Sequence, residues 1–264
     1  MKQVLRMLAF AGILALTLTA CGFGATATPP PVAPGDTPVV ILPTAAPGDP
    51  CANEYLPVRM GATWDYASSG STAGSYGFRK RITEVKPGEF SVGIGSGQDQ
   101  FRERWVCSPD GLVSQTMNVT DSASLQGLSR FNQIEVTNIV GINLPPAITR
   151  GAQWSYSADI QGTQVTSDGT VMATMTAKLT ITYVANGRES VTVAAGTYDA
   201  MAIATHTVIE FTINDAGGPS TLVADSTYTV WYAPGLGWVK SSGNGKLGGQ
   251  DYFETIELQN YQIP

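Results

Sequence analysis

The 264-residue sequence predicts an all-β fold, in which duplicated antiparallel β-meander units form a strongly curved sheet, a half-barrel or a barrel-like body. Three observations predict this class. Apolar and polar residues alternate with a period of two over long stretches. Turn signals that contain glycine, proline or asparagine separate these stretches. A tryptophan-containing motif also occurs twice along the chain, which indicates an internal repeat.

The composition excludes several classes of protein. The 43% hydrophobic and 14% charged residues argue against intrinsic disorder, and the net charge of -6 argues against nucleic-acid binding. A single histidine excludes most catalytic triads and most imidazole metal sites. The sequence also lacks the nucleophile elbow, the P-loop, the HExxH motif and the EF-hand loop. We therefore expect neither a cofactor nor a metal, and we expect that the protein is not an enzyme.

Residues 1–20 have the features of a secretory signal peptide. Basic residues precede an apolar run over 7–18, which is shorter than the roughly 20 residues that a membrane-spanning helix needs. The run ends in Leu18-Thr19-Ala20-Cys21, which resembles the lipobox of bacterial lipoproteins. The resemblance implies that lipid is attached to Cys21 and anchors the protein on the extracytoplasmic side of a bacterial membrane. Whether this is an inner or an outer membrane stays open.

A proline-rich linker is predicted over residues 21–50, after the lipidated cysteine. Eight of the sixteen prolines lie in this segment. Proline-rich chain favours the extended polyproline II conformation and cannot build a core. The linker would therefore hold the folded body away from the membrane.

Two further cysteines, Cys51 and Cys107, remain in the mature chain. Two thiols in an exported protein are expected to pair, so we predict a disulfide that fastens the end of the linker to the body. The alternative is a reactive thiol pair. It is disfavoured because no CxxC spacing or neighbouring histidine would lower a thiol pKa.

Residues 51–264 read as one compact body made of two homologous halves, 51–143 and 144–264. The segment Gly61-Ala62-Thr63-Trp64-Asp65-Tyr66 recurs as Gly151-Ala152-Gln153-Trp154-Ser155-Tyr156. Two further segments of the first half match the second half in the same order: 82–85 with 181–184, and 105–113 with 231–239. We therefore interpret the body as a duplication.

The strands of the second half are predicted to be unusually long. Apolar residues alternate with threonines over 171–183, and a second alternating stretch covers 200–213. At about 3.3 Å per residue such strands exceed the usual five or six residues, so they require a strongly curved sheet or a barrel. Whether the two halves form one continuous sheet or two packed domains is left open by the sequence.

The opening Tyr55-Leu56-Pro57 with Gly61, Trp64 and Tyr66 resembles that of uncharacterised exported bacterial β-rich lipoproteins. The same resemblance covers Val193-Ala194-Ala195-Gly196-Thr197-Tyr198-Asp199-Ala200 and the segment 231–240, WYAPGLGWVK. It implies a fold class and an exported setting, and no activity. In architecture alone, the predicted curved sheet is similar to the half-barrel of periplasmic lipoprotein carriers, whose concave face holds acyl chains.

Candidate ligand-binding residues are His206, Ala204, Glu210 and Trp231. His206 is the only histidine, and its strand places it among small residues, either exposed or lining a concavity. The alternative is a solvated strand histidine with no role. Glu103 lies between two arginines and is expected in a solvated cross-strand ion pair.

The aromatic residues of the repeated motifs have two interpretations. Packing in the core is favoured, and a carbohydrate platform or an apolar ligand site is the alternative. The Thr-rich strand faces would line a groove if the halves bend toward each other, and would be outer surface if the body closes.

Three functions are compatible with the sequence. The first is a non-enzymatic binding module that is anchored to the membrane by its lipid and contacts an envelope protein or a small apolar or polymeric ligand; a groove lined by both halves would favour it. The second is a carrier or sensor of acyl chains in a half-barrel cavity. The third is a hydrolase of envelope polymers, which would require a cluster of carboxylates.

Overall fold

The computed structural model describes residues 49–71, 74–96, 101–117 and 130–264. The predicted signal peptide, Cys21 and the linker up to residue 48 lie outside the described residues. Within them the chain forms strands and no helix, and so no helix that could span a membrane. The strands are β1 (Thr63–Gly70), β2 (Tyr76–Lys86), β3 (Glu89–Gly95), β4 (Phe101–Ser108), β5 (Gly111–Ser114), β6 (Gln133–Gly141), β7 (Gln153–Val165), β8 (Val171–Val193), β9 (Gly196–Asp215), β10 (Gly218–Ala233), β11 (Gly237–Leu247) and β12 (Gln250–Gln262).

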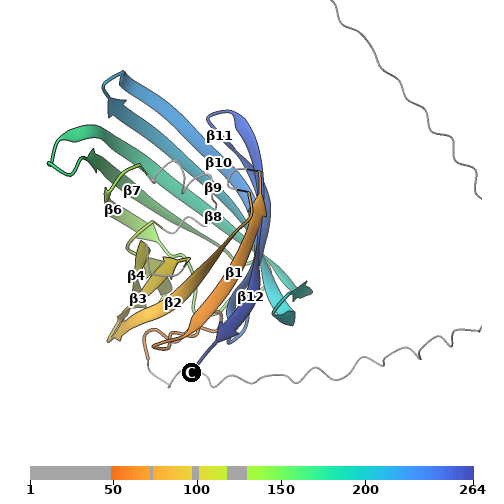
Figure 1. Ribbon diagram of the computed structural model, residues 1–264. Helices are drawn as coiled ribbons and strands as arrows, with labels where there is room; N and C mark the ends of the chain where they lie inside the picture. Colours follow the sequence, from red (N-terminus) through yellow and green to blue (C-terminus); the bar gives the residue numbers. More distant parts are fainter. Residues whose placement is uncertain (1–48, 72–73, 97–100, 118–129) are drawn as a thin grey trace, which may run out of the picture. The chain divides into compact units, whose positions relative to one another are not determined.

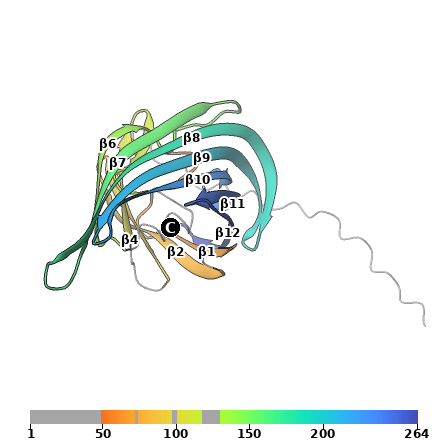
Figure 2. The same cartoon turned by 90° about the horizontal axis from the view of Figure 1, so that it is seen from above.

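The strands form one twelve-stranded antiparallel sheet that is nearly closed into a barrel (Figures 1 and 2). Its order is β5-β4-β3-β2-β1-β12-β11-β10-β9-β8-β7-β6. Read as a circle, every strand lies beside its neighbours in sequence, and β1 pairs with β12. The sheet is therefore an up-and-down meander that is opened between β5 and β6. The predicted all-β, barrel-like fold is confirmed, and the sheet is continuous.

An isolated bridge spans the opening between β5 and the segment after β6. The Leu112 amide donates a hydrogen bond of 2.8 Å to the Leu144 carbonyl, and the Leu144 amide donates one of 3.2 Å to the Leu112 carbonyl. These two bonds join the two edges of the sheet at one point. They bring Asn143 and Leu144 into the wall of the interior, next to β5.

Side chains alternate between the interior and the outer surface, as the period of two predicts. In β8, Met175 and Leu179 are buried, whereas Thr174, Thr176 and Lys178 are exposed. The Thr-rich face is therefore outer surface. This is the outcome expected for a body whose sheet closes on itself.

The interior contains two hydrophobic clusters. The aromatic cluster is shared by both halves and includes Trp64, Tyr66, Phe90, Trp105 and Trp238. The aliphatic cluster is built mainly from β7, β8 and β9 and includes Ile160, Met175, Leu179, Ile209 and Phe211.

The two repeated motifs occupy matching positions at the starts of β1 and β7. Gly61 and Gly151 have φ values of 83° and 84°. The Gly61 amide donates to the Ile82 carbonyl at 3.0 Å, and the Gly151 amide donates to the Ala185 carbonyl at 2.7 Å. The strand facing each motif then bulges just beyond Ile82 or Ala185. These shared contacts are what a duplication requires, and the duplication itself stays a prediction.

The geometry shifts one of the sequence matches. Ile82 of β2 corresponds in position to Ala185 of β8, four residues beyond the Ile181 that the sequence match pairs with it. The physical reason is the period of two, because a strand of alternating apolar residues and threonines matches itself equally well at several even offsets.

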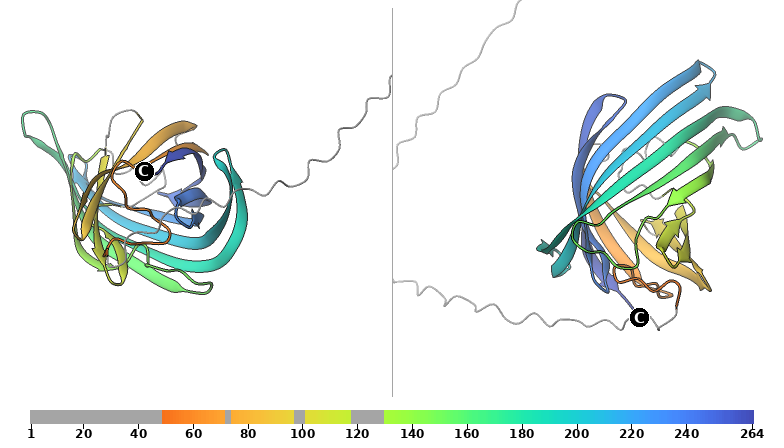
Figure 3. Two further views of the ribbon diagram at one scale, coloured as in Figure 1. Left: turned by 90° about the horizontal axis from the view of Figure 1, so that it is seen from below. Right: turned by 180° about the vertical axis from the view of Figure 1, so that it is seen from behind.

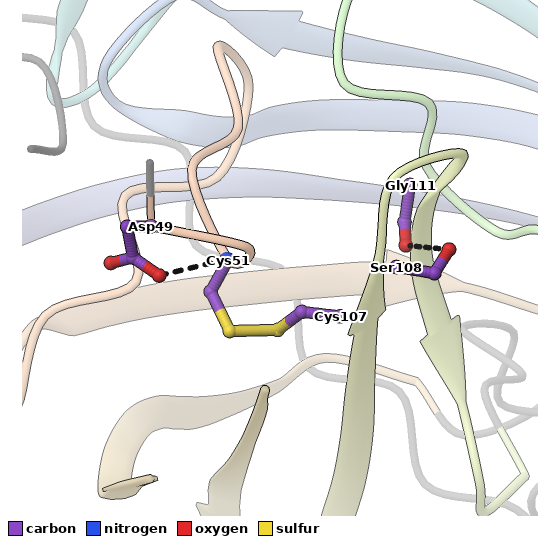
Figure 4. The surroundings of a disulfide bond; sticks show 5 residues. All are labelled: Asp49, Cys51, Cys107, Ser108 and Gly111. Carbon is purple, nitrogen blue, oxygen red and sulfur yellow. Dashed lines mark hydrogen bonds between the residues drawn. A yellow bond between two sulfur atoms is a disulfide. The ribbon is translucent and has the colours of Figure 1, made fainter. Parts of the chain in front are cut away.

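The predicted disulfide is present between Cys51 and Cys107 (Figure 4). Asp49 Oδ1 accepts a 2.8 Å hydrogen bond from the Cys51 amide, and Cys107 lies in β4. The bond therefore ties the chain before β1 to the body. The C-terminus lies at the same end of the body as the segment before β1 (Figure 3). There the Arg59 guanidinium donates to the Pro264 carbonyl at 2.9 Å.

Candidate binding cavity

A cavity of about 100 Å³ lies inside the barrel, within the aromatic cluster. Its lining side chains come from β1 to β4 and β7 to β11, with Leu56 from the segment before β1 and with Asn143 and Leu144 from the bridge segment. Both halves therefore contribute to it. The lining is mainly aliphatic and aromatic with a few polar groups, which is the usual composition of a small-molecule site.

The first-half motif places two aromatic rings in the cavity wall. Trp64 and Tyr66 both point inward because they are two residues apart on β1. Trp64 Nε1 donates a 2.7 Å hydrogen bond to the Leu236 carbonyl, and Tyr66 Oη donates one of 2.8 Å to the Trp238 carbonyl. Their polar atoms are thus satisfied by the backbone of the β10–β11 connection and of the start of β11, and the rings form a fixed wall.

The second-half motif contributes in the same way. Trp154 Nε1 donates to the Asn143 carbonyl at 3.1 Å, and its ring stacks on Tyr183 with centroids 5.1 Å apart. The repeated aromatics therefore pack in the core, which is the favoured interpretation of the sequence. Some of them also line the cavity.

One ion pair faces the cavity. Lys80 Nζ lies 3.2 and 3.4 Å from the two carboxylate oxygens of Glu103, and Trp105 Nε1 donates to Glu103 Oε2 at 3.2 Å. Glu103 is only 5% exposed, so the expectation of a solvated ion pair is wrong for this residue. A cation and an indole N–H both contact its carboxylate and replace part of the hydration that burial removes. The pair carries no net charge.

The indole N–H of Trp238, a residue that lines the cavity, is buried and has no hydrogen-bond partner among the described residues. Asn143 is 5% exposed and Trp238 is 6% exposed. Asn143 Oδ1 accepts a 2.7 Å hydrogen bond from the Ser114 amide, which fixes the orientation of the side-chain amide. Buried donors are nearly always paired in folded proteins, so the unpaired N–H of Trp238 is an exception.

The tyrosines of the cavity are uncharged at neutral pH. Burial raises the pKa of Tyr66, Tyr183 and Tyr232 above the ordinary value of a tyrosine, and for Tyr183 a hydrogen bond with the Asn143 side chain opposes this with a smaller lowering effect. Their hydroxyl groups therefore remain protonated. Among the described lining residues, Lys80 and Glu103 are the only ones that carry a charge at neutral pH.

The structure places the four candidate residues of the sequence analysis on the outer face of the sheet. His206, Ala204 and Glu210 share one face of β9, whose opposite face provides Ile203 and Thr205 to the cavity. Trp231 also points outward, where its Nε1 donates to Glu189 Oε1 at 2.5 Å. None of the four lines the cavity, and their role in binding stays a prediction.

His206 lies beside a second depression, which is open to solvent. Its Nε2 is 2.9 Å from Asp225 Oδ1, and Asp225 lines a recess of about 600 Å³ with Asn244, Lys246 and Phe253. Lys246 is itself paired with Asp251 at 2.6 Å. In the described part of the chain no group of three or more histidine, cysteine, aspartate or glutamate residues could hold a metal ion.

Sequence reasoning missed the polar groups of the cavity. Trp238 was visible as part of the second-half motif, but the motif does not reveal that its N–H is unpaired. Lys80 and Glu103 are 23 residues apart, on β2 and β4. They meet only because both side chains lie on the inward face of their strands. Asn143 carried no sequence signal, because its position depends on the bridge to β5.

Three solved structures of bacterial proteins are similar to this chain. A predicted exported protein with a YmcC-like fold from Bacteroides fragilis superimposes with a TM-score of 0.52 at 13% identity, covering 80% of this chain and 100% of its own. A predicted lipoprotein from Parabacteroides distasonis gives 0.49 at 14% identity, with 80% and 99% coverage. The hypothetical lipoprotein YmcC from Escherichia coli gives 0.34 at 13% identity, with 80% and 87% coverage.

At these identities the first of the three comparisons supports the fold alone. A comparison with curated proteins gives no match. The family model described as DUF3108-like matches residues 104–251, more than half of the sequence, from β4 to the start of β12. The chain belongs to the DUF3108-like family.

Proposed function

We propose that this protein is a lipid-anchored protein of the bacterial cell envelope whose β-body binds a ligand without catalysing a reaction. The observation that carries the proposal is the interior cavity, which both halves line with mainly apolar side chains and with the Lys80–Glu103 ion pair.

The cavity chemistry favours binding over catalysis. Hydrolysis of a glycosidic bond needs two carboxyl groups on either side of the scissile bond. Among the described lining residues, Glu103 is the single carboxylate, and it is held by Lys80 and Trp105. The third function considered from the sequence, a hydrolase of envelope polymers, therefore has no support in this cavity.

The envelope location and the anchor rest on two supports. Similar solved structures are described as an exported protein or as lipoproteins. The N-terminal Leu18-Thr19-Ala20-Cys21 sequence has the lipobox pattern. A diacylglyceryl group on Cys21 would hold the protein on the membrane, because each buried methylene contributes about 0.8 kcal/mol.

Labelling with a fatty acid in a bacterial host tests the anchor. The wild-type chain should incorporate the label and partition into the detergent phase, and Cys21→Ser should do neither. Cys51→Ser is the matched control, because it removes a cysteine without touching the predicted lipidation site. A Cys21→Ser chain that is still labelled would refute the anchor.

The acyl-carrier function is the second candidate, and the cavity size argues against it. Sites for drug-sized ligands usually measure about 300–1,000 Å³, whereas this cavity has about 100 Å³. Native mass spectrometry of residues 22–264, exported behind a cleavable signal and purified from envelope extract, separates the possibilities. A bound small polar molecule supports the proposal, and a bound fatty acid supports the carrier. A ligand-free protein contradicts both.

A further inference from the structure

We propose that the recess on the outer face of β10, β11 and β12 binds an uncharged sugar unit of a polysaccharide, with the C–H face of the sugar ring against Phe253. The exposed side chains of this recess and the side chains of the interior cavity lie on opposite faces of β10. The inference therefore goes beyond the proposed function and does not rest on it.

Six exposed side chains line the recess in two rows that cross the three strands. The first row is Phe253, Asn244 and Thr227, and the second is Asp251, Lys246 and Asp225. Because neighbouring strands lie about 4.8 Å apart, each row spans about 10 Å. The recess has a volume of about 600 Å³, which is within the roughly 300–1,000 Å³ of small-molecule sites.

Phe253 provides an apolar platform among polar groups. The residue is 60% exposed, and its neighbours in the recess are Asn244 on β11 and Asp251 on its own strand. A sugar ring has one face made mainly of C–H groups and carries its hydroxyl groups around the edge. Contact between that face and the phenyl ring removes apolar surface of both from water. An exposed ring in polar surroundings is thus suited to a ligand that is apolar on one side only.

The side chains around Phe253 complement the hydroxyl groups of a sugar. The amide of Asn244 and the hydroxyl of Thr227 can each donate and accept a hydrogen bond. The carboxylates of Asp225 and Asp251 accept hydrogen bonds. Since a sugar hydroxyl is both a donor and an acceptor, either row offers it a partner.

The charges of the recess favour an uncharged ligand. Lys246 Nζ lies 2.6 Å from Asp251 Oδ1, and His206 Nε2 lies 2.9 Å from Asp225 Oδ1. An anionic ligand would be repelled by the two carboxylates, and a cationic ligand would be repelled by Lys246. A neutral sugar contacts these groups without separating either pair.

A glycan array tests the ligand class. Residues 22–264 are applied to an array of neutral and anionic oligosaccharides. We expect saturable binding of at least one neutral oligosaccharide and at least tenfold weaker binding of anionic ones. Binding of anionic oligosaccharides alone, or of none, overturns the inference.

Phe253→Ala tests the platform with the neutral oligosaccharide that binds best. We expect about a tenfold loss of affinity, because the variant removes the ring on which the sugar lies. Phe101→Ala is the matched control, since Phe101 is 58% exposed on β4 and does not line the recess. It should bind like the wild type. Both rings are mostly exposed, so both variants should fold. Unchanged affinity in Phe253→Ala overturns the site.

A measurement on the unmodified chain locates the ligand without any substitution. The side-chain amide resonances of Asn244 should shift during the titration. Those of Asn138, which is exposed on β6 and donates to Asp159 at 2.7 Å, should not shift. Unchanged Asn244 resonances at saturation overturn the recess as the site. If the indole resonances of Trp64 and Trp238 shift instead, the sugar lies in the interior cavity, and the proposed function survives although this inference fails.

Discussion

Strands β1 and β7 begin alike and end differently. Each starts with a glycine of positive φ, followed by an inward tryptophan and an inward tyrosine that donate to backbone carbonyls. Beyond the tyrosine, β1 turns Ser68 inward, where its hydroxyl donates to the buried Glu254 at 2.7 Å. In β7 the next inward residues are Ala158 and Ile160, which belong to the aliphatic cluster.

The difference shows that the shared motif determines how each strand enters the barrel, whereas the inward residues beyond the motif differ in chemistry between the two strands. The interior next to β1 contains hydrogen-bonded polar groups. Besides Ser68, Tyr76 also donates to Glu254 at 3.0 Å. The β7 side forms a dry aliphatic wall. We therefore expect substitutions beyond the motif to change the free energy of unfolding by different amounts in the two strands. Substitutions within the motif should change it by similar amounts.

The largest effect is expected for Ile160→Ala in β7. Ile160 is 1% exposed within the aliphatic cluster, so its truncation leaves a cavity and should lower the free energy of unfolding by about 2–5 kcal/mol. Chemical denaturation measures it, with the neighbouring Gln161→Ala on the exposed face as control. A loss as small as that of the control would mean that the aliphatic cluster is not tightly packed.

The second prediction concerns the pH dependence of stability, and it compares the inward tyrosines of the two motifs, Tyr66 and Tyr156. Burial raises the pKa of Tyr156 to about 12, above the value near 10 of an unfolded chain. The unfolded state therefore loses its proton first, and the stability that this hydroxyl provides is complete below pH 10 and decreases as pH rises through 12. The decrease amounts to about 2–3 kcal/mol.

Tyr156→Phe should remove this part of the alkaline decrease, and denaturation curves at pH 9 and pH 11.5 measure it. Because burial also raises the pKa of Tyr66, Tyr66→Phe should have an effect of the same sign. An unchanged pH dependence in both variants would exclude tyrosine ionisation as the cause.

Ser68→Ala in β1 should have a smaller effect than Ile160→Ala. It removes one donor from Glu254 and leaves the Tyr76 hydroxyl, so we expect a loss of about 1–3 kcal/mol from the weakened solvation of a buried carboxyl group. Ser69→Ala, on the exposed face of the same strand, is the control. If the two serine variants are equally stable, Glu254 does not depend on Ser68.

Much of the fold follows from the sequence. Alternation in 171–183 determines which side chains share a face, and the two cysteines that remain when Cys21 is set aside as the predicted lipidation site predict the disulfide. Alternation alone does not say which face is enclosed. That depends on the pairing of β1 with β12 and on the Leu112–Leu144 bridge, which join residues far apart in sequence. His206 was singled out for its chemistry and lies outside, whereas Asn143 and Glu103 acquire their roles only from partners on other strands.

The smallest effect tests the motif itself. Gly61 and Gly151 have positive φ, and a Cβ would meet only Pro264 at 3.9 Å in the first case and nothing within 4 Å in the second. The cost of Gly61→Ala and of Gly151→Ala should therefore come from the left-handed backbone alone, about 1–2 kcal/mol, and should be equal. Gly77→Ala serves as the control, because it adds a Cβ at an exposed position in β2 with only an ordinary contact at 3.5 Å. Thermal denaturation of the three variants measures the costs. Unequal costs at Gly61 and Gly151 would mean that the two glycines do not have the same structural role, which would weaken the case for a duplication.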